Sequence, residues 1–360
     1  MGRVETVSGS IEPEELGITL PHEHIICDLT TAWASKISLL PKQIDLVTLK
    51  DLSEIRENPL IMKDNLKLQD AKLATKEIKA FKNIGGSSIV DLTTSFGRDP
   101  ITLREISKET QIHIIAATGW YTASSHPPYV KKKNVKELRE MIVHDLLSGF
   151  NDTGIKAGAI GEIGCSASLH HDERKVLEAA AQAQRDTHAC LYVHITSWNL
   201  NTKTQPRNGL THLDIIEKEG GNPEKCVMCH MDSYNKEGLP LLGVDIDYHR
   251  TLLNRNATIE YDLFGRFDSS QDNVFAGATF PSDRERIAAI VELCKQGYDK
   301  QLLLSQDVCQ RIHYTTYGGK GYAFILKHIV PRLKYAGVSD KQIRNMLIEN
   351  HKELLNEVSK

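Results

Sequence analysis

Six residues of types that bind divalent metals each lie at the end of a short apolar run. They follow the order His-x-His, Glu, His, His, Asp, and they are His22, His24, Glu162, His194, His230 and Asp307. A single histidine on an apolar run is usually a hydrogen-bonded core residue. Five such runs, spread over residues 22–307, instead predict a parallel sheet whose strand ends converge on a metal site.

The residue types in this set suit metal-assisted hydrolysis. On a strand, His22 and His24 point to one face and Glu23 to the other. Glu162 follows the apolar run AGAIG and would be costly to bury without a cation, either a metal or an arginine. Its carboxylate can bridge two ions, and Asp307 can ligate a metal and accept a proton from water. Two divalent ions that share a water lower its pKa and polarise a carbonyl or phosphoryl oxygen.

The elements that must position these residues alternate between strands and helices. We expect strands near 17–24, 87–93, 112–118, 157–162, 190–195, 226–231, 256–262 and 301–307, because these runs are short and apolar. Helical patterns lie between them, including LATKEIKAFKNIGG, HHDERKVLEAAAQAQRDTH, and SDRERIAAIVELCKQGY with its capping box of Ser282 and Glu285. This alternation predicts an α/β fold, a (β/α)8 TIM barrel. A doubly wound sheet is the alternative, although no glycine-rich phosphate fingerprint follows the first strand.

The sequence predicts one domain over residues 1–360. Residues 3–16 are expected to form a short N-terminal β-hairpin that turns at Gly9 and Ser10, so that the hairpin occupies 1–16, the barrel 17–340 and a C-terminal helix 341–360. The long connection 28–70 contains Trp33, Pro41 and Pro59. Connections of this length usually carry function or form a lid.

Composition excludes several classes of protein. The net charge of −3 gives no electrostatic reason for nucleic-acid binding, and no apolar stretch is long enough to span a bilayer. The N-terminus has no hydrophobic segment of the secretory kind, and seven cysteines without repeated spacing suit a reducing compartment, so we expect a cytoplasmic protein. Cys226-Val-Met-Cys229-His230 matches the haem-attachment pattern, but haem attachment belongs to exported proteins. We interpret both cysteines as small core residues on opposite faces of a strand.

Several long segments resemble the phosphotriesterase family of the amidohydrolase superfamily, in particular its phosphotriesterase-related branch. The resembling segments are TVSGSIEPEELGITLPHEH, IKAGAIGEIGCS, ERKVLEAAAQAQ, VMCHMD, IEYDLFG and YGGKGYAFILKHIVP. The resemblance implies a (β/α)8 barrel with a binuclear divalent centre. His22, His24 and Asp307 would hold the more buried metal, and His194 and His230 the more exposed one.

Two positions depart from the common pattern of that family. Glu162 stands where members with phosphotriesterase or lactonase activity usually carry a carboxylated lysine, which argues against efficient organophosphate hydrolysis. His351 stands where relatives usually show Asn-Pro, in the last helix, and we expect only a structural effect there.

The resemblance also implies a reaction. The branch is associated with hydrolysis of N-acetyltaurine and related N-acyl amino acids, giving taurine and acetate, by metal-bound hydroxide with Asp307 as the catalytic base. The cofactors would be two divalent ions, with zinc favoured and manganese, cobalt or nickel able to substitute. The partner would be a small-molecule substrate, and the resemblance is compatible with a homodimer. A lactonase or phosphoester hydrolase with the same centre, and a catalytically silent metal-bound scaffold, are the alternatives.

A sulfonate-bearing substrate needs a pocket with a cation or strong hydrogen-bond donors. The candidates that follow predicted strand ends are Arg98, Tyr121, His126 and Tyr261. Arg311, four residues after Asp307, is a further arginine for which we favour a surface or packing role. For each candidate, packing against the barrel is the alternative to substrate binding.

Overall fold

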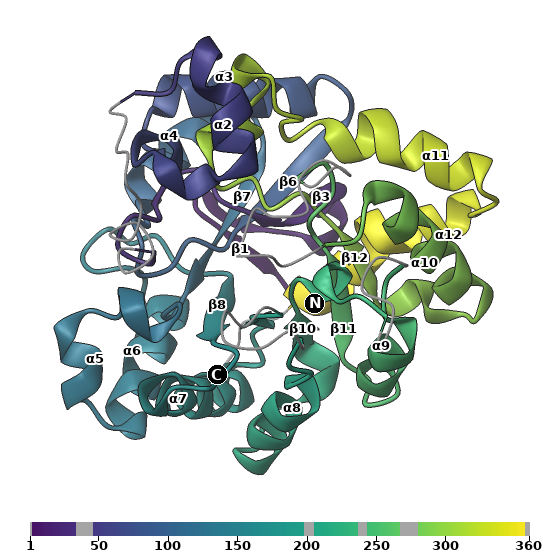
Figure 1. Cartoon of the computed structure of the whole chain (residues 1–360). Helices are drawn as coiled ribbons and strands as arrows, with labels where there is room; N and C mark the ends of the chain where they lie inside the picture. Colours follow the sequence, from purple (N-terminus) through teal and green to yellow (C-terminus); the bar gives the residue numbers. More distant parts are fainter. Residues whose placement is uncertain (1, 34–45, 198–204, 237–242, 267–279, 357–360) are drawn as a thin grey trace.

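Eight parallel strands form one sheet that curves into a barrel in the computed structural model, which describes residues 2–33, 46–197, 205–236, 243–266 and 280–356 (Figure 1). In sheet order the strands are β3 (Ile18–Glu23), β6 (Gly86–Asp91), β7 (His113–Thr118), β8 (Ala159–Cys165), β9 (Leu191–Ile195), β10 (Cys226–Met228), β11 (Thr258–Tyr261) and β12 (Leu302–Leu304). The strand pairs are parallel from β3 to β12. All eight predicted strands are therefore confirmed, and so is the predicted barrel.

Backbone hydrogen bonds join the last strand region to the first and close the ring. Asp307 N–H donates to His22 O at 3.2 Å, and His24 N–H donates to Val308 O at 3.1 Å. The Ser305 hydroxyl oxygen also accepts a hydrogen bond from His22 N–H, at 3.2 Å. Closure brings the first and last of the six predicted ligands together although they are far apart in the sequence.

Helices surround the barrel (Figure 1). The longer ones are α3 (Ala71–Lys82), α4 (Pro100–Thr110), α6 (Val135–Leu147), α7 (His171–Thr187), α8 (Gly209–Lys218), α9 (Ile246–Leu253) and α10 (Asp283–Lys295). Shorter ones are α2 (Leu52–Glu57), α5 (Pro128–Lys132), α11 (Val330–Tyr335), α12 (Asp340–Arg344) and α13 (Asn350–Leu355). The capping box of Ser282 and Glu285 begins α10 as predicted. Two π-helical segments, Ile325–Ile329 and Asn345–Glu349, precede α11 and join α12 to α13.

The strands are buried on both faces, as their apolar runs predict. Val90, Ile115 and Leu303 belong to a cluster inside the barrel, whereas Ile89 and Ile114 belong to the larger layer between strands and helices. Cys229 lies in the inner cluster and Cys226 in the outer layer. The predicted placement of these two cysteines on opposite faces is therefore confirmed.

The N-terminal hairpin consists of β1 (Val4–Thr6) and β2 (Gly9–Ile11), with Thr6 paired to Gly9. The turn therefore lies at Val7 and Ser8, and the prediction that it lies at Gly9 and Ser10 was wrong. Two contacts explain the shift. Val7 N–H donates to Ile114 O at 2.9 Å, which anchors the turn to the barrel, and Ser8 N–H donates to the Thr6 hydroxyl at 3.2 Å.

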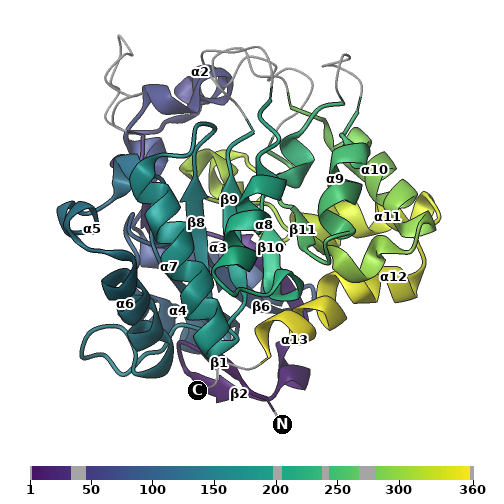
Figure 2. The ribbon, with the colours of Figure 1, turned by 90° about the horizontal axis from the view of Figure 1, so that it is seen from below.

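The hairpin and the end of the chain lie at the opposite end of the barrel from α2 (Figure 2). Val4 and Leu16 pack in the inner cluster with Leu354 and Leu355 of α13. The long connection after β3 contains α2 and is tied at its ends by antiparallel pairing of β4 (Cys27–Asp28) with β5 (Lys67–Leu68). Pro41 of that connection lies outside the described residues. No helix in the described part of the chain is long and apolar enough to cross a membrane.

Candidate metal centre

The six predicted ligands converge at the carboxyl ends of the barrel strands, around the carboxylate of Glu162. Its Oε1 lies 3.5 Å from His24 Nε2, and its Oε2 lies 2.9 Å from His194 Nδ1. The same Oε2 lies 3.6 Å from His22 Nε2 and 3.5 Å from His230 Nε2. Asp307 Oδ1 completes the set at 3.3 Å from His24 Nε2. Two groups with metal-binding geometry, His22–His24–Glu162 and Glu162–His194–His230, therefore share Glu162.

Each of the four imidazoles has one ring nitrogen directed toward Glu162. Its second ring nitrogen contacts a residue outside the set of six. His22 Nδ1 lies 2.9 Å from Glu260 Oε2, and His230 Nδ1 lies 2.9 Å from Asp262 Oδ1. His24 Nδ1 lies 3.0 Å from the Thr93 hydroxyl, and His194 Nε2 lies 3.2 Å from the Tyr121 hydroxyl. This pattern is typical of metal-binding histidines, because an outer partner fixes the ring and leaves the inner nitrogen to the ion.

Polar atoms without partners point into the same space. His22 Nε2 and Asp307 Oδ1 are buried and form no hydrogen bond with the residues that the structure describes. Such atoms are costly to bury unless something else binds them. Four buried carboxylates also surround these imidazoles, which must be neutral to act as ligands. The carboxylates belong to Glu162, Asp307, Glu260 and Asp262, and Arg266 is the cation that pairs with Asp307. The residues therefore fit divalent cations.

Local backbone geometry places three of the ligands. Gly161 has φ +120°, and a Cβ there would lie 2.4 Å from Tyr192 O, so only glycine fits where β8 is irregular beside Glu162. His230 and Asp307 have φ values of 59° and 49°. Residues other than glycine rarely adopt this left-handed conformation, and where they do they cluster at functional sites.

The ionisation of the cluster reflects burial opposed by neighbouring charges. Burial alone would raise the pKa of Glu162, but His194 and His230 hold that pKa well below its usual range. Burial alone would lower the pKa of His230, but the Asp262 and Glu162 carboxylates raise it to about 10. Burial lowers the pKa of His194, with Glu162 opposing this shift. At each of these groups, neighbouring charges therefore oppose the effect of burial.

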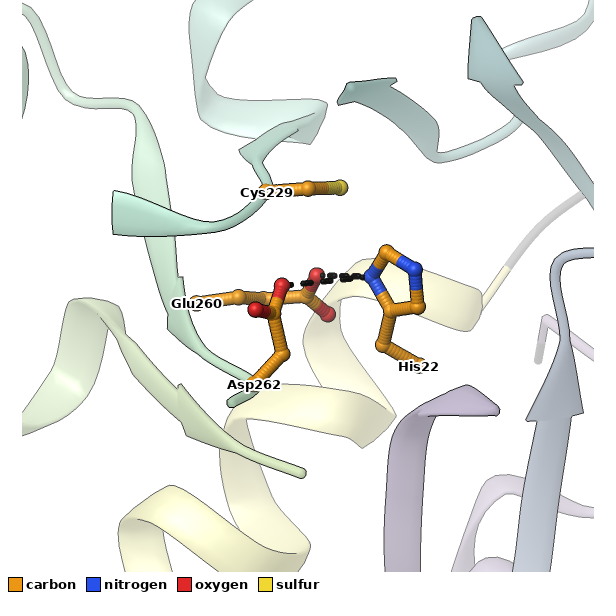
Figure 3. Close-up of side chains that lie close together, drawn as sticks. All are labelled: His22, Cys229, Glu260 and Asp262. Atoms are coloured by element: carbon orange, nitrogen blue, oxygen red, sulfur yellow. Dashed lines mark hydrogen bonds and ion pairs between the residues drawn. The ribbon is translucent and has the colours of Figure 1, made fainter. Parts of the chain in front are cut away.

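His22 also lies close to Cys229, Glu260 and Asp262 (Figure 3). The His22 ring nitrogen that meets Glu260 lies 3.3 Å from Asp262 Oδ2 as well. Burial raises the pKa of the Cys229 thiol. We interpret Cys229, Glu260 and Asp262 as a support that orients the His22 ring. They surround Nδ1, which is already hydrogen-bonded to Glu260, so we do not interpret them as a further metal site.

A small cavity of about 40 Å³ opens above the cluster. Besides five of the predicted ligands, the described residues that line it are Leu29, Trp33, Tyr121, Leu263, Arg266, Phe280 and Cys309. Most of its wall is therefore apolar or aromatic. Trp33 comes from the long connection, which agrees with the expectation that this connection covers the site.

Of the four predicted substrate residues, Tyr121 lines the cavity and the other three do not. Arg98 donates to Ala117 O at 3.1 Å, lies 3.6 Å from Asp145 and stacks on Phe150. His126 Nε2 contacts Tyr121 O at 2.8 Å.

Tyr261 is buried, and its hydroxyl lies 3.1 Å from His249 Nδ1. Arg98, His126 and Tyr261 thus make packing contacts in the described residues, and their role in substrate binding stays a prediction. Arg311 also has the packing role that we favoured, since it is bound to Asp64.

Three functional candidates were missed in the sequence. Glu260 and Asp262 lie two apart on β11 and just after it, and this Glu-x-Asp spacing mirrors His22-x-His24. The signal was therefore present in IEYD. Arg266 lies four residues beyond Asp262 and forms a buried ion pair with Asp307, and no local pattern marks that contact.

Comparison with known proteins agrees with this geometry. The model of the phosphotriesterase family matches residues 2–355. Proteins named N-acetyltaurine hydrolase from Dictyostelium discoideum and Bos taurus are each 33% identical to this chain, covering 99% and 98% of it respectively and 98% of their own length. The crystal structure of a resiniferatoxin-binding protein from Rhodobacter sphaeroides superposes with a TM-score of 0.87 at 36% identity, covering 98% of this chain and 95% of that one.

Proposed function

Because this chain belongs to the phosphotriesterase family, we propose that it is a metal-dependent hydrolase of small N-acyl amino acids, with N-acetyltaurine as its substrate. The products would be taurine and acetate. In this reaction the bond between the acyl carbon and nitrogen breaks, a bond from water oxygen to that carbon forms, and the leaving nitrogen gains a proton. The relatives named for this activity support the substrate class.

The observation that carries the proposal is that two ligand groups share Glu162. His22, His24, Asp307 and Glu162 would hold one divalent ion, and His194, His230 and Glu162 a second. Bound there, the ions would activate water and polarise the acyl oxygen. Imidazole and carboxylate ligands favour zinc.

The protein's own residues divide the remaining tasks. Asp307 lies at the edge of both the cluster and the cavity and is suited to take a proton from water and return it to the leaving amine. Tyr121 orients His194 through the contact between its hydroxyl and Nε2. The apolar wall formed by Leu29, Leu263 and Phe280 suits an acyl group, and the small cavity favours a short one.

Arg266 is suited to bind the anionic end of the substrate. It is the one lysine or arginine among the described residues that line the cavity. A guanidinium binds sulfonate and carboxylate groups through charge-assisted hydrogen bonds.

All seven cysteines are free and buried, which supports a reducing compartment, and we place the protein in the cytoplasm.

A substrate panel on metal-loaded protein tests the proposal. N-acetyltaurine and several N-acetyl amino acids would be compared with lactones and aryl phosphates, with released amine or acid measured directly. We expect turnover of the anionic amides and little turnover of the aryl phosphates. Turnover of lactones alone would replace the proposal with a lactonase, and zero turnover with two ions bound would support a silent scaffold.

A further inference from the structure

A second and larger cavity, of about 390 Å³, lies beside the catalytic one. Most of its wall comes from residues that follow the last two barrel strands, including Gly265 and Arg266 after β11 and Val308 after β12, and Arg56 of α2 completes it. Arg266 lines both cavities. The larger cavity therefore adjoins the reaction centre through the residue that pairs with Asp307.

The larger cavity has an excess of positive charge. Arg56, Arg266, Lys320 and Arg332 line it, and Asp283 is the one carboxylate among its described lining residues. Asp283 is already engaged, since its Oδ1 accepts from Gly265 N–H at 3.1 Å and from Arg286 Nη1 at 3.2 Å.

Three of these cations have no anionic partner in the described ranges of the chain. Arg56 donates to the backbone carbonyl of Gly318 at 3.1 Å. The Lys320 ammonium lies 5.6 Å from the centre of the Phe324 ring. Arg332 is exposed on α11 and faces the same cavity. Like charges gathered around one hollow repel each other, and an anion would relieve that repulsion.

Neutral groups in the wall also suit an anion. His313 Nδ1 accepts a hydrogen bond from Cys309 N–H at 3.2 Å, so the neutral ring carries its proton on Nε2, as a donor. Gly318, Gly319 and Gly321 form part of the wall, where backbone without side chains allows a ligand to approach closely. The YGGKGY segment therefore contributes to this larger cavity, and the proposed hydrolytic reaction gives it no role.

The location agrees with a general property of the fold. In (β/α)8 barrels, the loops after the seventh and eighth strands frequently form a phosphate-binding site. Described residues just after β11 and β12, the seventh and eighth strands here, line the cavity.

We propose that this cavity binds a phosphate-sized oxyanion through Arg56, Lys320 and Arg332, with Arg266 between it and the catalytic cavity. The oxyanion would be either a free inorganic anion or the phosphate or sulfonate group of a small molecule. The site does not depend on the proposed hydrolytic function, because binding can be measured without turnover.

The test is calorimetric titration of inorganic phosphate into three metal-loaded proteins: the wild type, the double variant K320M/R332Q and the control K327M. Lys320 and Arg332 are exposed, so their replacement should leave the fold intact. Lys327 is exposed nearby but does not line the cavity. We expect the double variant to bind phosphate at least about tenfold more weakly, because charge-assisted hydrogen bonds are lost, and K327M to match the wild type.

Two further measurements secure the interpretation. The charge-conserving variant K320R/R332K should bind phosphate like the wild type, which separates loss of charge from loss of fold. Saturating taurine should abolish the phosphate titration if the substrate's own sulfonate occupies the cavity, and should leave it unchanged if the ligand is a separate anion.

Phosphate held only by the metal ions would not respond to Lys320 or Arg332. Equal phosphate affinity in wild type and K320M/R332Q would therefore overturn the proposal. Absence of any binding to the wild type at millimolar phosphate would overturn it too.

Discussion

The Glu23 carboxylate accepts a hydrogen bond of 2.7 Å from the backbone N–H of Val308, the residue directly after Asp307. Its other oxygen accepts from the Ser305 hydroxyl at 2.7 Å and from Gln306 N–H at 3.0 Å. Glu23 is buried between His22 and His24 in the sequence and points away from them. One side chain thus ties the strand that carries two candidate ligands to the loop that carries another.

Replacing Glu23 with Gln should weaken both the fold and the metal centre. A glutamine amide has one acceptor oxygen and would turn its N–H₂ group toward a backbone N–H, so at least one bond is lost. We expect the free energy of unfolding to fall by about 1–3 kcal/mol, the usual cost of an unsatisfied buried group. We also expect metal affinity to fall by about 10–100-fold, as for other residues that support ligands. Urea unfolding and competition with a chelator measure the two effects, and the exposed Glu105→Gln is the control.

Glu162→Gln should lower the metal content, because both proposed ion sites use this carboxylate. Wild-type protein purified without chelator should hold about two ions per chain, as binuclear hydrolysis requires. The variant should hold fewer, and its melting temperature should approach that of chelated wild type, since ions bound only by the folded state stabilise it. Elemental analysis and thermal unfolding provide the readouts. Full loading of the variant would show that Glu162 is a salt-bridged core residue and no ligand.

The barrel and the convergence of the six candidate ligands could be predicted because their signals are local. Apolar runs define strands buried on both faces, and parallel strands bring their carboxyl ends together. His194 and Glu162, for example, could be identified as candidate ligands from their positions at the ends of such runs. The outer partners of the histidines were also within reach, since Glu260 and Asp262 repeat the two-residue spacing of the ligands on a strand.

Contacts made by loops could not be predicted in the same way. Arg98 lies in the connection between β6 and α4, and its guanidinium contacts Asp145 and Ala117 O, away from the cavity. Arg266, in the segment after β11, lies no farther beyond its strand than Arg98 does, yet it returns to Asp307. Which arginine reaches the centre depends on the path of the chain after each strand. That path cannot be predicted from the spacing of residues or from composition.

Asp307→Asn should abolish turnover while the fold is retained. The variant keeps the size of the side chain but loses the charge that binds an ion and accepts a proton. We expect kcat to fall at least about a hundredfold, the lower range for loss of a general base. Far-UV circular dichroism and metal analysis should accompany the kinetics. Asp64→Asn, which alters the ion pair with Arg311 away from the cavity, is the matched control and should retain activity. Wild-type kcat in Asp307→Asn would remove the proposed role of Asp307.

Arg266→Met should change substrate preference more than it changes catalysis. The variant keeps an apolar stem but removes the cation that faces the cavity. We expect kcat/KM for N-acetyltaurine to fall about 10–100-fold, the loss of a charge-assisted contact, mainly through KM. A neutral amide such as N-acetylethylamine, which lacks the sulfonate, should lose much less. An equal loss of kcat/KM for both substrates would show that Arg266 acts only through Asp307. The anionic end of the substrate would then be bound by another group.

His351 should make the protein less stable in acid. It is fully buried on α13, and burial lowers its pKa to about 3. The unfolded chain takes up a proton near pH 6.5, whereas the folded protein does so only near pH 3. Between these values the unfolded state binds the extra proton, so the free energy of unfolding should decrease by up to about 1.4 kcal/mol for each unit that the pH falls.

Replacing His351 with Leu removes this contribution, because leucine cannot be protonated. Urea unfolding of both proteins at pH 7.5, 6.0 and 5.0 measures it, and the difference between the two cancels the titration of all other groups. We expect the wild type to lose stability relative to His351→Leu as the pH falls below about 6.5, with the gap widening at each step. Parallel pH dependences would mean that His351 gains a proton in the folded protein as readily as in the unfolded chain, and that the buried ring is solvated on the time scale of the measurement.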